Sequence, residues 1–314
     1  MNETMKAAII DDFGPPEVLR VAAVPRPAPE EKELLIRVHA ASVNPVDCKT
    51  RAGGGVAKRM SGFPLVLGWD VSGVVEAVGP GADGVQVGDE VYGMVRFPQA
   101  GAAYAEYVVA PVEHVAPKPA AISHREAAAL PLAGLTAWQA LFDEAKVAAG
   151  QRVLVHAAAG GVGHLVVQLA RWRGATVIGT SSARNAEFAQ GLGCDQVVDH
   201  QAARFEEEVA PVDVVIDCVG GELAQRSLDV VRPGGALVTL PSPVEWEDAA
   251  ARDVNATWML VHPDRDQLVK LAELADEGTL RPYVEQTFAL DDVAAAHHRS
   301  ETGRVRGKLV IDVA

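Results

Sequence analysis

The stretch from Arg152 to Ala170, RVLVHAAAGGVGHLVVQLA, constrains the fold of this chain more than any other. Its apolar residues 153–155 are typical of a strand buried on both faces, and those from 165 onward recur at helical spacing. Glycines at the junction permit a tight turn and let an anion approach free N–H groups at the helix start. The sequence therefore predicts a strand, a dinucleotide-binding turn and a helix, with the phosphates held by Ala159, Gly160, Gly161, Val162 and Gly163.

The next expected strand, Ala175–Gly179, ends in TSSARN, where a NAD-binding unit usually carries an acidic residue for the ribose hydroxyls. No acid stands there. Hydroxyl groups and a guanidinium suit the additional 2′-phosphate of NADP(H), so we expect this cofactor to contact Thr180, Ser181, Ser182 and Arg184. The same residues could instead cap and solubilise the following helix, since Ser is a common N-cap.

Composition excludes several classes of protein. The 314 residues suffice for two domains with substantial cores, and a formal net charge of −14 disfavours nucleic acid or an anionic membrane as partner. We find no apolar run of membrane-spanning length and no signal-type N-terminus, so we expect a cytoplasmic protein. Three scattered cysteines, Cys48, Cys194 and Cys218, form no disulfide framework or cysteine-rich zinc lobe.

The character of the chain changes after Pro119. Before it, short β-like runs alternate with Gly/Pro turns and predict an irregular, mostly antiparallel barrel. After it we expect two Ala-rich helices, one from the N-cap Ser123 through Leu130 and one from Gly134 to Val147.

From Arg152 onward, strands alternate with helices, which predicts a doubly wound parallel sheet. The tail is expected to form a helix over Arg265–Asp276 and then strands that return to the N-terminal domain. The predicted α/β fold thus has a β-rich domain over residues 1–122 and 262–314 and a dinucleotide-binding domain over residues 123–261.

Several segments in this order resemble the zinc-free quinone oxidoreductase (zeta-crystallin-like) branch of the medium-chain dehydrogenase/reductase superfamily. The resemblance spans nearly the whole chain. It implies a GroES-like catalytic domain, a Rossmann domain inserted between its two sequence segments, an active site in the interdomain cleft, and a homodimer. The matching segments are KAAIIDDFGPPEVL, ASVNPVDCKTRAG, PLVLGWDVSGVVEAVG, VGDEVYG, AAYAEYVVAP, PLAGLTAWQAL and AAAGGVG.

Zinc-dependent alcohol dehydrogenases of the same superfamily bind their catalytic metal in the segments that match NPVD and GWD. In those relatives a Cys occupies the place of Asn44, and a His-Glu pair occupies that of Trp69 and Asp70. An amide, an indole and one carboxylate cannot assemble a catalytic zinc site. We therefore expect no catalytic metal, and a hydride acceptor that does not need activation by a Lewis acid.

The resemblance implies hydride transfer from NADPH to a small quinone or α,β-unsaturated carbonyl, with negative charge moving to an oxygen that hydrogen-bond donors can stabilise. Asn44 is expected near the nicotinamide, where it could orient the carboxamide or the substrate oxygen, and Asp47 is expected to hold the loop or a water. Each has a structural alternative, since Asn44-Pro45 also suits a turn and Asp47 a helix cap. Thr136 resembles a nicotinamide contact, with an ordinary helix hydroxyl as the alternative.

The chain departs from many relatives at the expected proton donor. They carry a Tyr just after the NPVD segment, where this chain has Cys48, Lys49 and Thr50. Lys49 could substitute as donor or be a solvated charge, and Cys48 is expected to be a small buried residue. Tyr104 is expected to pack or hydrogen-bond within the barrel.

Further cofactor contacts are expected at the carboxyl ends of the later strands, where open α/β sheets bind ligands. They are Cys218, Val219, Gly220, Leu240 and Ser242, with His200 either against the adenosine or in a surface turn. The expected substrate-pocket walls, each with packing as its alternative, are Trp69, Arg96, Phe97 and Trp246.

Two other functions stay open on the sequence. A reductase of 2-enoyl thioesters would use the same cofactor and fold, although the missing Tyr and the overall acidity weaken that interpretation. A structural or sensor protein would bind NADPH without turnover. Oxidation of NADPH across a panel of acceptors distinguishes the three.

Overall fold

The computed structural model describes residues 3–313, which form two compact units. Unit 1 contains Met1–Leu135 and His262–Ala314, and unit 2 contains Thr136–Val261. The first division falls after Leu135 rather than after residue 122, because helix α2 (His124–Ala128) packs on strands of unit 1. Ser123 caps this helix as expected, and its hydroxyl accepts a hydrogen bond from the Glu126 amide.

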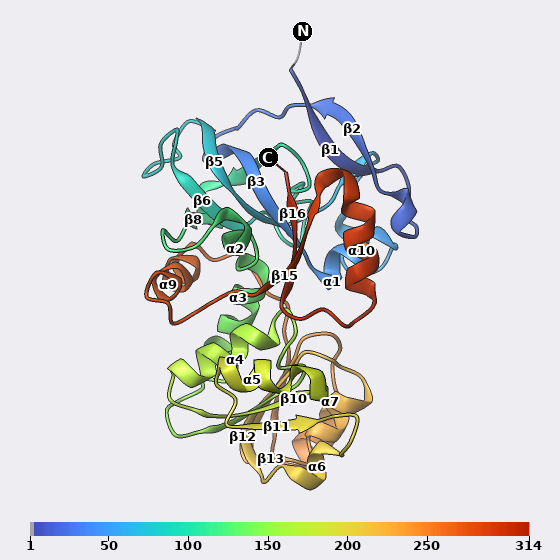
Figure 1. The fold of residues 1–314 in the computed structure, drawn as a ribbon, viewed down its shortest axis with the longest axis vertical. Coiled ribbons are helices and arrows are strands. Elements are labelled where there is room, and N and C mark those ends of the chain that lie inside the picture. Colours follow the sequence, from blue (N-terminus) through green and yellow to red (C-terminus); the bar gives the residue numbers. More distant parts are fainter. Residues whose placement is uncertain (1–2, 314) are drawn as a thin grey trace. The chain divides into compact units, whose positions relative to one another are not determined.

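Unit 1 is the expected β-rich, mostly antiparallel domain (Figure 1). Among the described residues, its larger sheet has the order β15-β16-β3-β5-β6-β8 with β7 beside β3, and a smaller sheet has the order β2-β1-β4. The strands are β1 (Thr4–Ile10), β2 (Arg20–Pro25), β3 (Glu33–Val43), β4 (Leu65–Val66), β5 (Asp70–Val78), β6 (Glu90–Met94), β7 (Tyr107–Pro111), β8 (Val115–Pro117), β15 (Val284–Ala289) and β16 (Lys308–Asp312).

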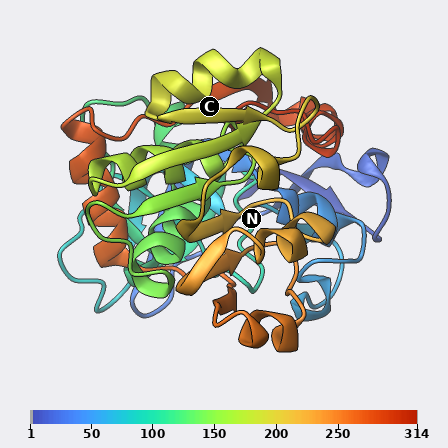
Figure 2. The same cartoon turned by 90° about the horizontal axis from the view of Figure 1, so that it is seen from below.

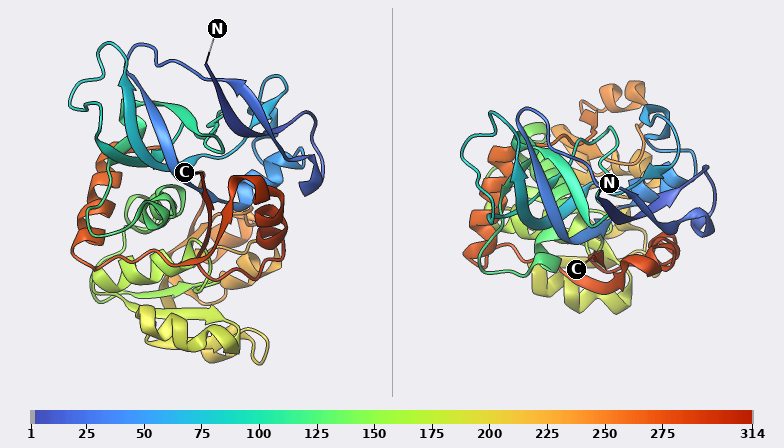
Figure 3. Two further views of the ribbon diagram at one scale, coloured as in Figure 1. Left: turned by 45° about the horizontal axis from the view of Figure 1, so that its top comes forward. Right: turned by 90° about the horizontal axis from the view of Figure 1, so that it is seen from above.

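The tail returns to this unit, as predicted. Strand β16 pairs antiparallel with β3 and parallel with β15, and helix α10 packs against both of the tail's strands (Figure 3). Helix α9 has the predicted bounds. The helices of this unit are α1 (Pro45–Arg51), α2, α9 (Arg265–Asp276) and α10 (Val293–Glu301), with short 3₁₀ turns η1 (Pro16–Val18), η2 (Ala57–Arg59), η3 (Val112–His114) and η6 (Leu290–Asp292).

Unit 2 is the predicted doubly wound domain. Its strands are parallel throughout, in the order β11-β10-β9-β12-β13-β14, and helices cover both faces of the sheet (Figure 2). The order reverses between β9 and β12, the place where such sheets bind nucleotides. The strands are β9 (Arg152–Val155), β10 (Thr176–Ser181), β11 (Gln196–Asp199), β12 (Val212–Asp217), β13 (Val231–Thr239) and β14 (Asn255–Trp258).

The helix expected over Gly134–Val147 begins earlier and changes character. Helix α3 (Pro131–Trp138) starts at a proline, which suits a first helical turn, and continues as the π-helix η4 (Gln139–Glu144). The other helices of unit 2 are α4 (Gly163–Trp172), η5 (Ala183–Asn185), α5 (Ala186–Leu192), α6 (Phe205–Glu208), α7 (Glu222–Ser227) and α8 (Trp246–Ala251). In the described part of the chain, no helix has the length and apolarity to cross a bilayer.

Candidate cofactor and active site

The turn between β9 and α4 leaves three backbone amides available. Among residues 3–313, the N–H groups of Gly161, Val162 and Gly163 have no acceptor, and no side chain caps the helix. Helix α4 is 10 residues long, so its N-terminal dipole adds to these donors. The predicted turn therefore presents the donor group that a pyrophosphate needs.

Gly163 is required by a close approach. A Cβ there would lie 2.1 Å from the carbonyl oxygen of Ala157 and 3.0 Å from the Cα of Ala158. Ala157 itself adopts a left-handed conformation, with φ of 54°. The helix start thus sits directly on the end of β9, and no larger residue fits at position 163.

A buried histidine that the sequence analysis missed anchors this turn. His156 is fully buried, and burial lowers its pKa to about 3. Because the Ser227 hydroxyl donates to the Leu223 carbonyl, the Nε2–H of His156 donates to Ser227 and leaves Nδ1 to accept from Thr180. The Thr180 oxygen then accepts the amide of Ala157, which ties β10 to the turn.

This network changes the expected 2′-phosphate site. The Thr180 hydroxyl is buried and occupied, and the nearly buried Ser181 hydroxyl donates to the Ser182 carbonyl, so neither is presented to a ligand. Ser182 is half-exposed and Arg184 is exposed in η5, directly after β10. Of the four predicted contacts, Ser182 and Arg184 are thus the two whose side chains reach solvent.

Asp217, at the end of β12, organises the two later loops. Its buried carboxylate accepts from the amides of Val219 and Gly220, at 2.9 Å each, and from the Thr239 hydroxyl at 2.9 Å. The Ser242 hydroxyl accepts the amide of Gly221 at 3.1 Å. The loop residues after Asp217 were predicted as contacts and Asp217 itself was not, although an acid that ends the fully buried strand VDVVID is a visible signal.

The remaining expected contacts lie at the same edge of the sheet. His200 is exposed just after β11, and its amide donates to the Ser181 carbonyl. Leu240 is half-buried, and its amide donates to the Asp217 carbonyl. Cys218 is half-buried and Val219 is 50% exposed.

In unit 1, Asn44 lies at the N-terminus of α1 with its side chain fixed. Its Nδ2 donates to Asp70 at 2.9 Å, and its Oδ1 accepts from the Lys308 ammonium at 2.5 Å. Its own amide donates to Asp47 at 2.6 Å. Asn44 is 1% exposed and both polar atoms of its side chain are occupied by these two partners, and its expected contact with the nicotinamide stays a prediction.

The centre of this cluster is Asp70. Besides Asn44, its carboxylate accepts from the Ser42 hydroxyl at 2.6 Å and the Leu132 amide at 2.7 Å, and the Lys308 ammonium lies 3.6 Å away. Asp70 and Lys308 are both buried, and burial lowers the pKa of Lys308. Lys308 was not among the predicted site residues, because it lies 264 residues from Asn44 along the chain and has no local sequence signal.

Asp47 completes the cluster as the third residue of α1. Its Oδ2 accepts the amide of Asn44, which matches the expected loop-holding role, while its Oδ1 is buried without a partner among the described residues. Burial raises the pKa of Asp47 to about 7.

Tyr104 packs over Gly68. Burial together with the nearby Asp47 raises the pKa of Tyr104, so the Tyr104 hydroxyl stays protonated.

Replacing Asp47 with Asn is expected to remove a pH dependence of stability. The carboxyl has a pKa near 3.8 when solvated and about 7 when folded, so unfolding is favoured increasingly as pH rises from about 4 to 7. An Asn keeps an oxygen for the Asn44 amide and does not ionise. In urea unfolding, the free energy of unfolding of the variant should rise relative to that of the parent by on the order of 2–4 kcal/mol across this range.

The exposed Asp83→Asn change is the control for the Asp47 variant and should give no such trend. A constant difference between the Asp47 variant and the parent from pH 4 to 7 would show that Asp47 is already ionised in the folded protein.

The other residues discussed with Asn44 differ in their burial. Cys48 is buried, and burial raises its pKa to about 12, which disfavours a nucleophilic thiolate. Lys49 is exposed and Thr50 buried. Thr136 is 5% exposed in α3, at the start of unit 2.

The four residues expected to line a substrate pocket are divided between the two units. Trp69 and Phe97 are 1% and 4% exposed and pack edge to face, with the Trp69 indole donating to the Gln99 carbonyl. Arg96 forms an ion pair with Glu33. Trp246 is 48% exposed in unit 2. Packing, the alternative given for each of these residues, therefore describes Trp69 and Phe97 in this structure, and the substrate pocket stays a prediction.

The side chains at the positions that correspond to zinc ligands do not suit zinc. The side chains of Asn44 and Asp70 are committed to each other and to Lys308, and Trp69 packs in the core. The described residues contain no group of three or more His, Cys, Asp or Glu side chains arranged to hold a metal ion. The opposite charge beside Asp70 is the Lys308 ammonium, 3.6 Å away.

Two family models match this chain. Residues 30–120 match the alcohol dehydrogenase GroES-like domain, and residues 192–311 match the family described as zinc-binding dehydrogenase. The second description names a metal for which the cluster around Asn44 has no ligand set.

Whole-chain relatives agree on the family. The 2-methylene-furan-3-one reductase of Solanum lycopersicum is 37% identical over 317 residues, which cover 98% of this chain and 79% of that protein. The quinone oxidoreductase of Mus musculus is 30% identical over 330 residues, covering 99% and 98%. The solved quinone oxidoreductase from Coxiella burnetii is 42% identical, with a TM-score of 0.95 over 99% of this chain and 100% of that one.

Proposed function

Because the chain belongs to the quinone oxidoreductase branch of the medium-chain dehydrogenase/reductase superfamily, we propose that it reduces a quinone or an α,β-unsaturated carbonyl with NADPH and without zinc. The observation that carries the proposal is the cluster of Asn44, Asp70 and Lys308, in which an ammonium occupies the charge-neutralising role next to Asp70. A saturated ketone or alcohol would lack Lewis-acid activation at such a site. A conjugated acceptor accepts hydride at carbon and delocalises the charge to oxygen, so it needs only hydrogen-bond donors.

The cofactor would be held by groups already at the edge of the sheet in unit 2. The amides of Gly161–Gly163 suit the pyrophosphate, and Ser182 and Arg184 suit the 2′-phosphate. Asp217 fixes the loops that follow β12 and β13. When bound, NADPH supplies the hydride, and the protein supplies orientation and electrostatics.

A panel assay tests the proposal. Protein treated with a chelator should oxidise NADPH over many turnovers with a quinone or a short enone, and much more slowly with the matching saturated ketone. Activity that is lost on chelation and restored by zinc would contradict the metal-free mechanism. Preference for enoyl thioesters would favour the thioester reductase instead, and stoichiometric binding without oxidation would favour a sensor.

Cofactor choice is tested by Arg184→Ala. A charged hydrogen bond to phosphate contributes about 1.5–3 kcal/mol, so NADPH should bind about ten- to a hundredfold more weakly while NADH binding hardly changes. Calorimetric titration with both cofactors measures this. The control is Arg252→Ala, which removes an exposed arginine of unit 2 paired with Asp229. It should change the affinity for neither NADPH nor NADH. Equal losses for both cofactors would assign Arg184 a structural role.

A further inference from the structure

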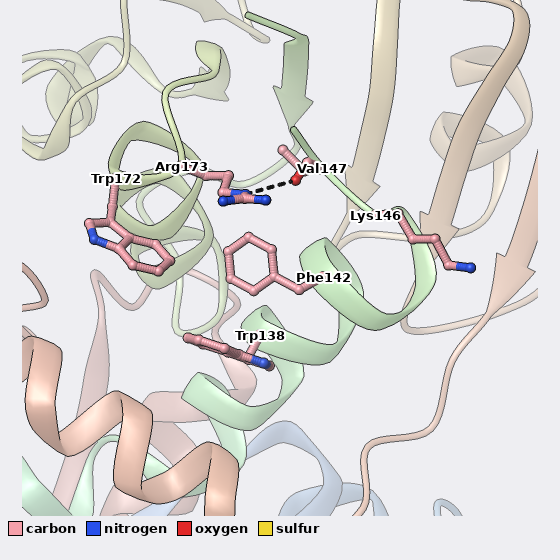
Figure 4. Close-up of a pocket in the computed structure, with 6 residues that line it drawn as sticks. All are labelled: Trp138, Phe142, Lys146, Val147, Trp172 and Arg173. Carbon is pink, nitrogen blue, oxygen red and sulfur yellow. Dashed lines mark hydrogen bonds between the residues drawn. The ribbon is translucent and has the colours of Figure 1, made fainter. Parts of the chain in front are cut away.

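A hollow on unit 2 is formed by residues with no part in the sites described above. Its volume is about 340 Å³. The walls come from the end of α3, from η4 and the segment after it, and from the end of α4, all within unit 2. The lining residues are Trp138, Phe142, Lys146, Val147, Trp172 and Arg173 (Figure 4).

Three aromatic rings form one side of the hollow. The centroids of Trp138 and Phe142 are 4.8 Å apart in an edge-to-face arrangement, and Trp172 lies 6.2 Å from Trp138 and 6.1 Å from Phe142. Trp172 nevertheless remains 46% exposed. Such an exposed indole beside two other rings leaves an aromatic surface on which a further planar ring can stack.

Arg173 adds a positioned cation at the hollow. Its Nε–H donates to the Val147 carbonyl at 3.3 Å, which holds the guanidinium near Phe142 (Figure 4). In the part of the chain that the structure describes, its terminal N–H groups have no hydrogen-bond partner. Two free N–H₂ groups in a planar fork are suited to a carboxylate or sulfonate.

The charge of the residues that line this hollow is opposite to that of the chain as a whole. Its lining contains two basic residues and no acidic one, whereas the whole chain carries a formal net charge of −14. The Lys146 side chain points away from the rings (Figure 4), so Arg173 is the cation that a stacked ligand would meet. Aromatic walls with one positioned cation favour a flat, apolar ligand with a single negative group.

We propose that this hollow binds a planar aromatic anion, with its ring against Trp172 and its carboxylate or sulfonate on Arg173. A two-ring carboxylate such as 2-naphthoate has both features. Its amide, 2-naphthamide, has the same ring and no charge, which separates the contribution of Arg173 from that of the aromatic wall.

Ligand-observed NMR titrations with these two probes test the site. The parent protein should bind 2-naphthoate about three- to tenfold more tightly than 2-naphthamide, and Arg173→Gln should abolish the difference. Trp172→Leu should weaken both probes about two- to tenfold. Saturation with NADPH should leave both affinities unchanged, because the hollow shares no residue with the cofactor cradle.

Two controls match the variants. Arg171→Gln removes a neighbouring arginine whose side chain is 57% exposed and pairs with Asp195, and Phe63→Leu removes an exposed aromatic from unit 1. Neither should change either affinity. The site would be overturned if 2-naphthoate failed to bind, if it bound no better than 2-naphthamide, or if Arg173→Gln and Trp172→Leu behaved like the controls.

Discussion

Replacing Gly163 with alanine is expected to weaken NADPH binding by at least about 100-fold. The added Cβ would meet the backbone of Ala157 and Ala158 at 2.1–3.0 Å, so the start of α4 must move away from β9. That shift displaces the three free amides of the turn together. Two lost charge-assisted hydrogen bonds, at about 1.5 kcal/mol each, already amount to about 100-fold. Calorimetry with NADPH, supported by circular dichroism, measures the effect.

Gly191→Ala is the matched control for this change. Gly191 also lies in a helix of unit 2, α5, but a Cβ there meets no atom within 4 Å. Alanine is favoured over glycine inside a helix by about 0.5–1 kcal/mol, so this variant should be slightly more stable and bind NADPH normally.

A second substitution keeps the prediction testable if Gly163→Ala folds poorly. Gly161 is half-exposed in the same turn, and a valine there should obstruct the anion while the sheet still forms. A folded Gly161→Val protein with normal NADPH affinity would refute the assignment of the cradle.

Lys308→Met is expected to destabilise the protein by about 3–5 kcal/mol, the usual cost of leaving a buried charge without its partner. Asp70 would keep the hydrogen bonds from Ser42, Asn44 and Leu132 and lose its counter-charge. Combining Lys308→Met with Asp70→Asn should restore part of the loss, because no buried charge is then unbalanced. Urea unfolding of the two single variants and the double variant measures this coupling.

A surface pair provides the comparison. Lys270 and Glu273 lie on α9 with side chains 58% and 53% exposed, so Lys270→Met should cost no more than about 1 kcal/mol. NADPH binding to the folded Lys308→Met protein should persist, since the cradle belongs to unit 2. An effect of Lys308→Met as small as that of Lys270→Met would show that the buried pair is dispensable.

Local patterns allowed most of unit 2 to be predicted. The strand at 152–155, the glycine turn and the helix after it follow from hydrophobic period and from glycine's small size, and both can be read within 20 residues. The role of His156 was not predicted, because a lone histidine after a strand is equally consistent with a surface turn. Only the packed structure shows that His156 and the Ala157 amide occupy the Thr180 hydroxyl.

The cluster of unit 1 could be predicted only in part. Asn44 and Asp47 are three residues apart at a helix start, and their capping contact is a local property of the sequence. Lys308 and Asp70 are brought to them by strand pairing, which no local pattern specifies. For Trp69, the sequence indicated a large apolar surface, but the direction that it faces depends on the sheet as a whole.

The return of β16 to β3 has a consequence for biosynthesis. Strands β15 and β16 emerge from the ribosome after all of unit 2, so unit 2 can fold while the main sheet of unit 1 still lacks these two strands. Until Lys308 arrives, the carboxylate of Asp70 has no cation beside it, and β3 has an open edge towards β16. The nascent protein would then have a complete nucleotide-binding turn and an unfinished neighbour, whose unpaired edge is where a chaperone would be most useful.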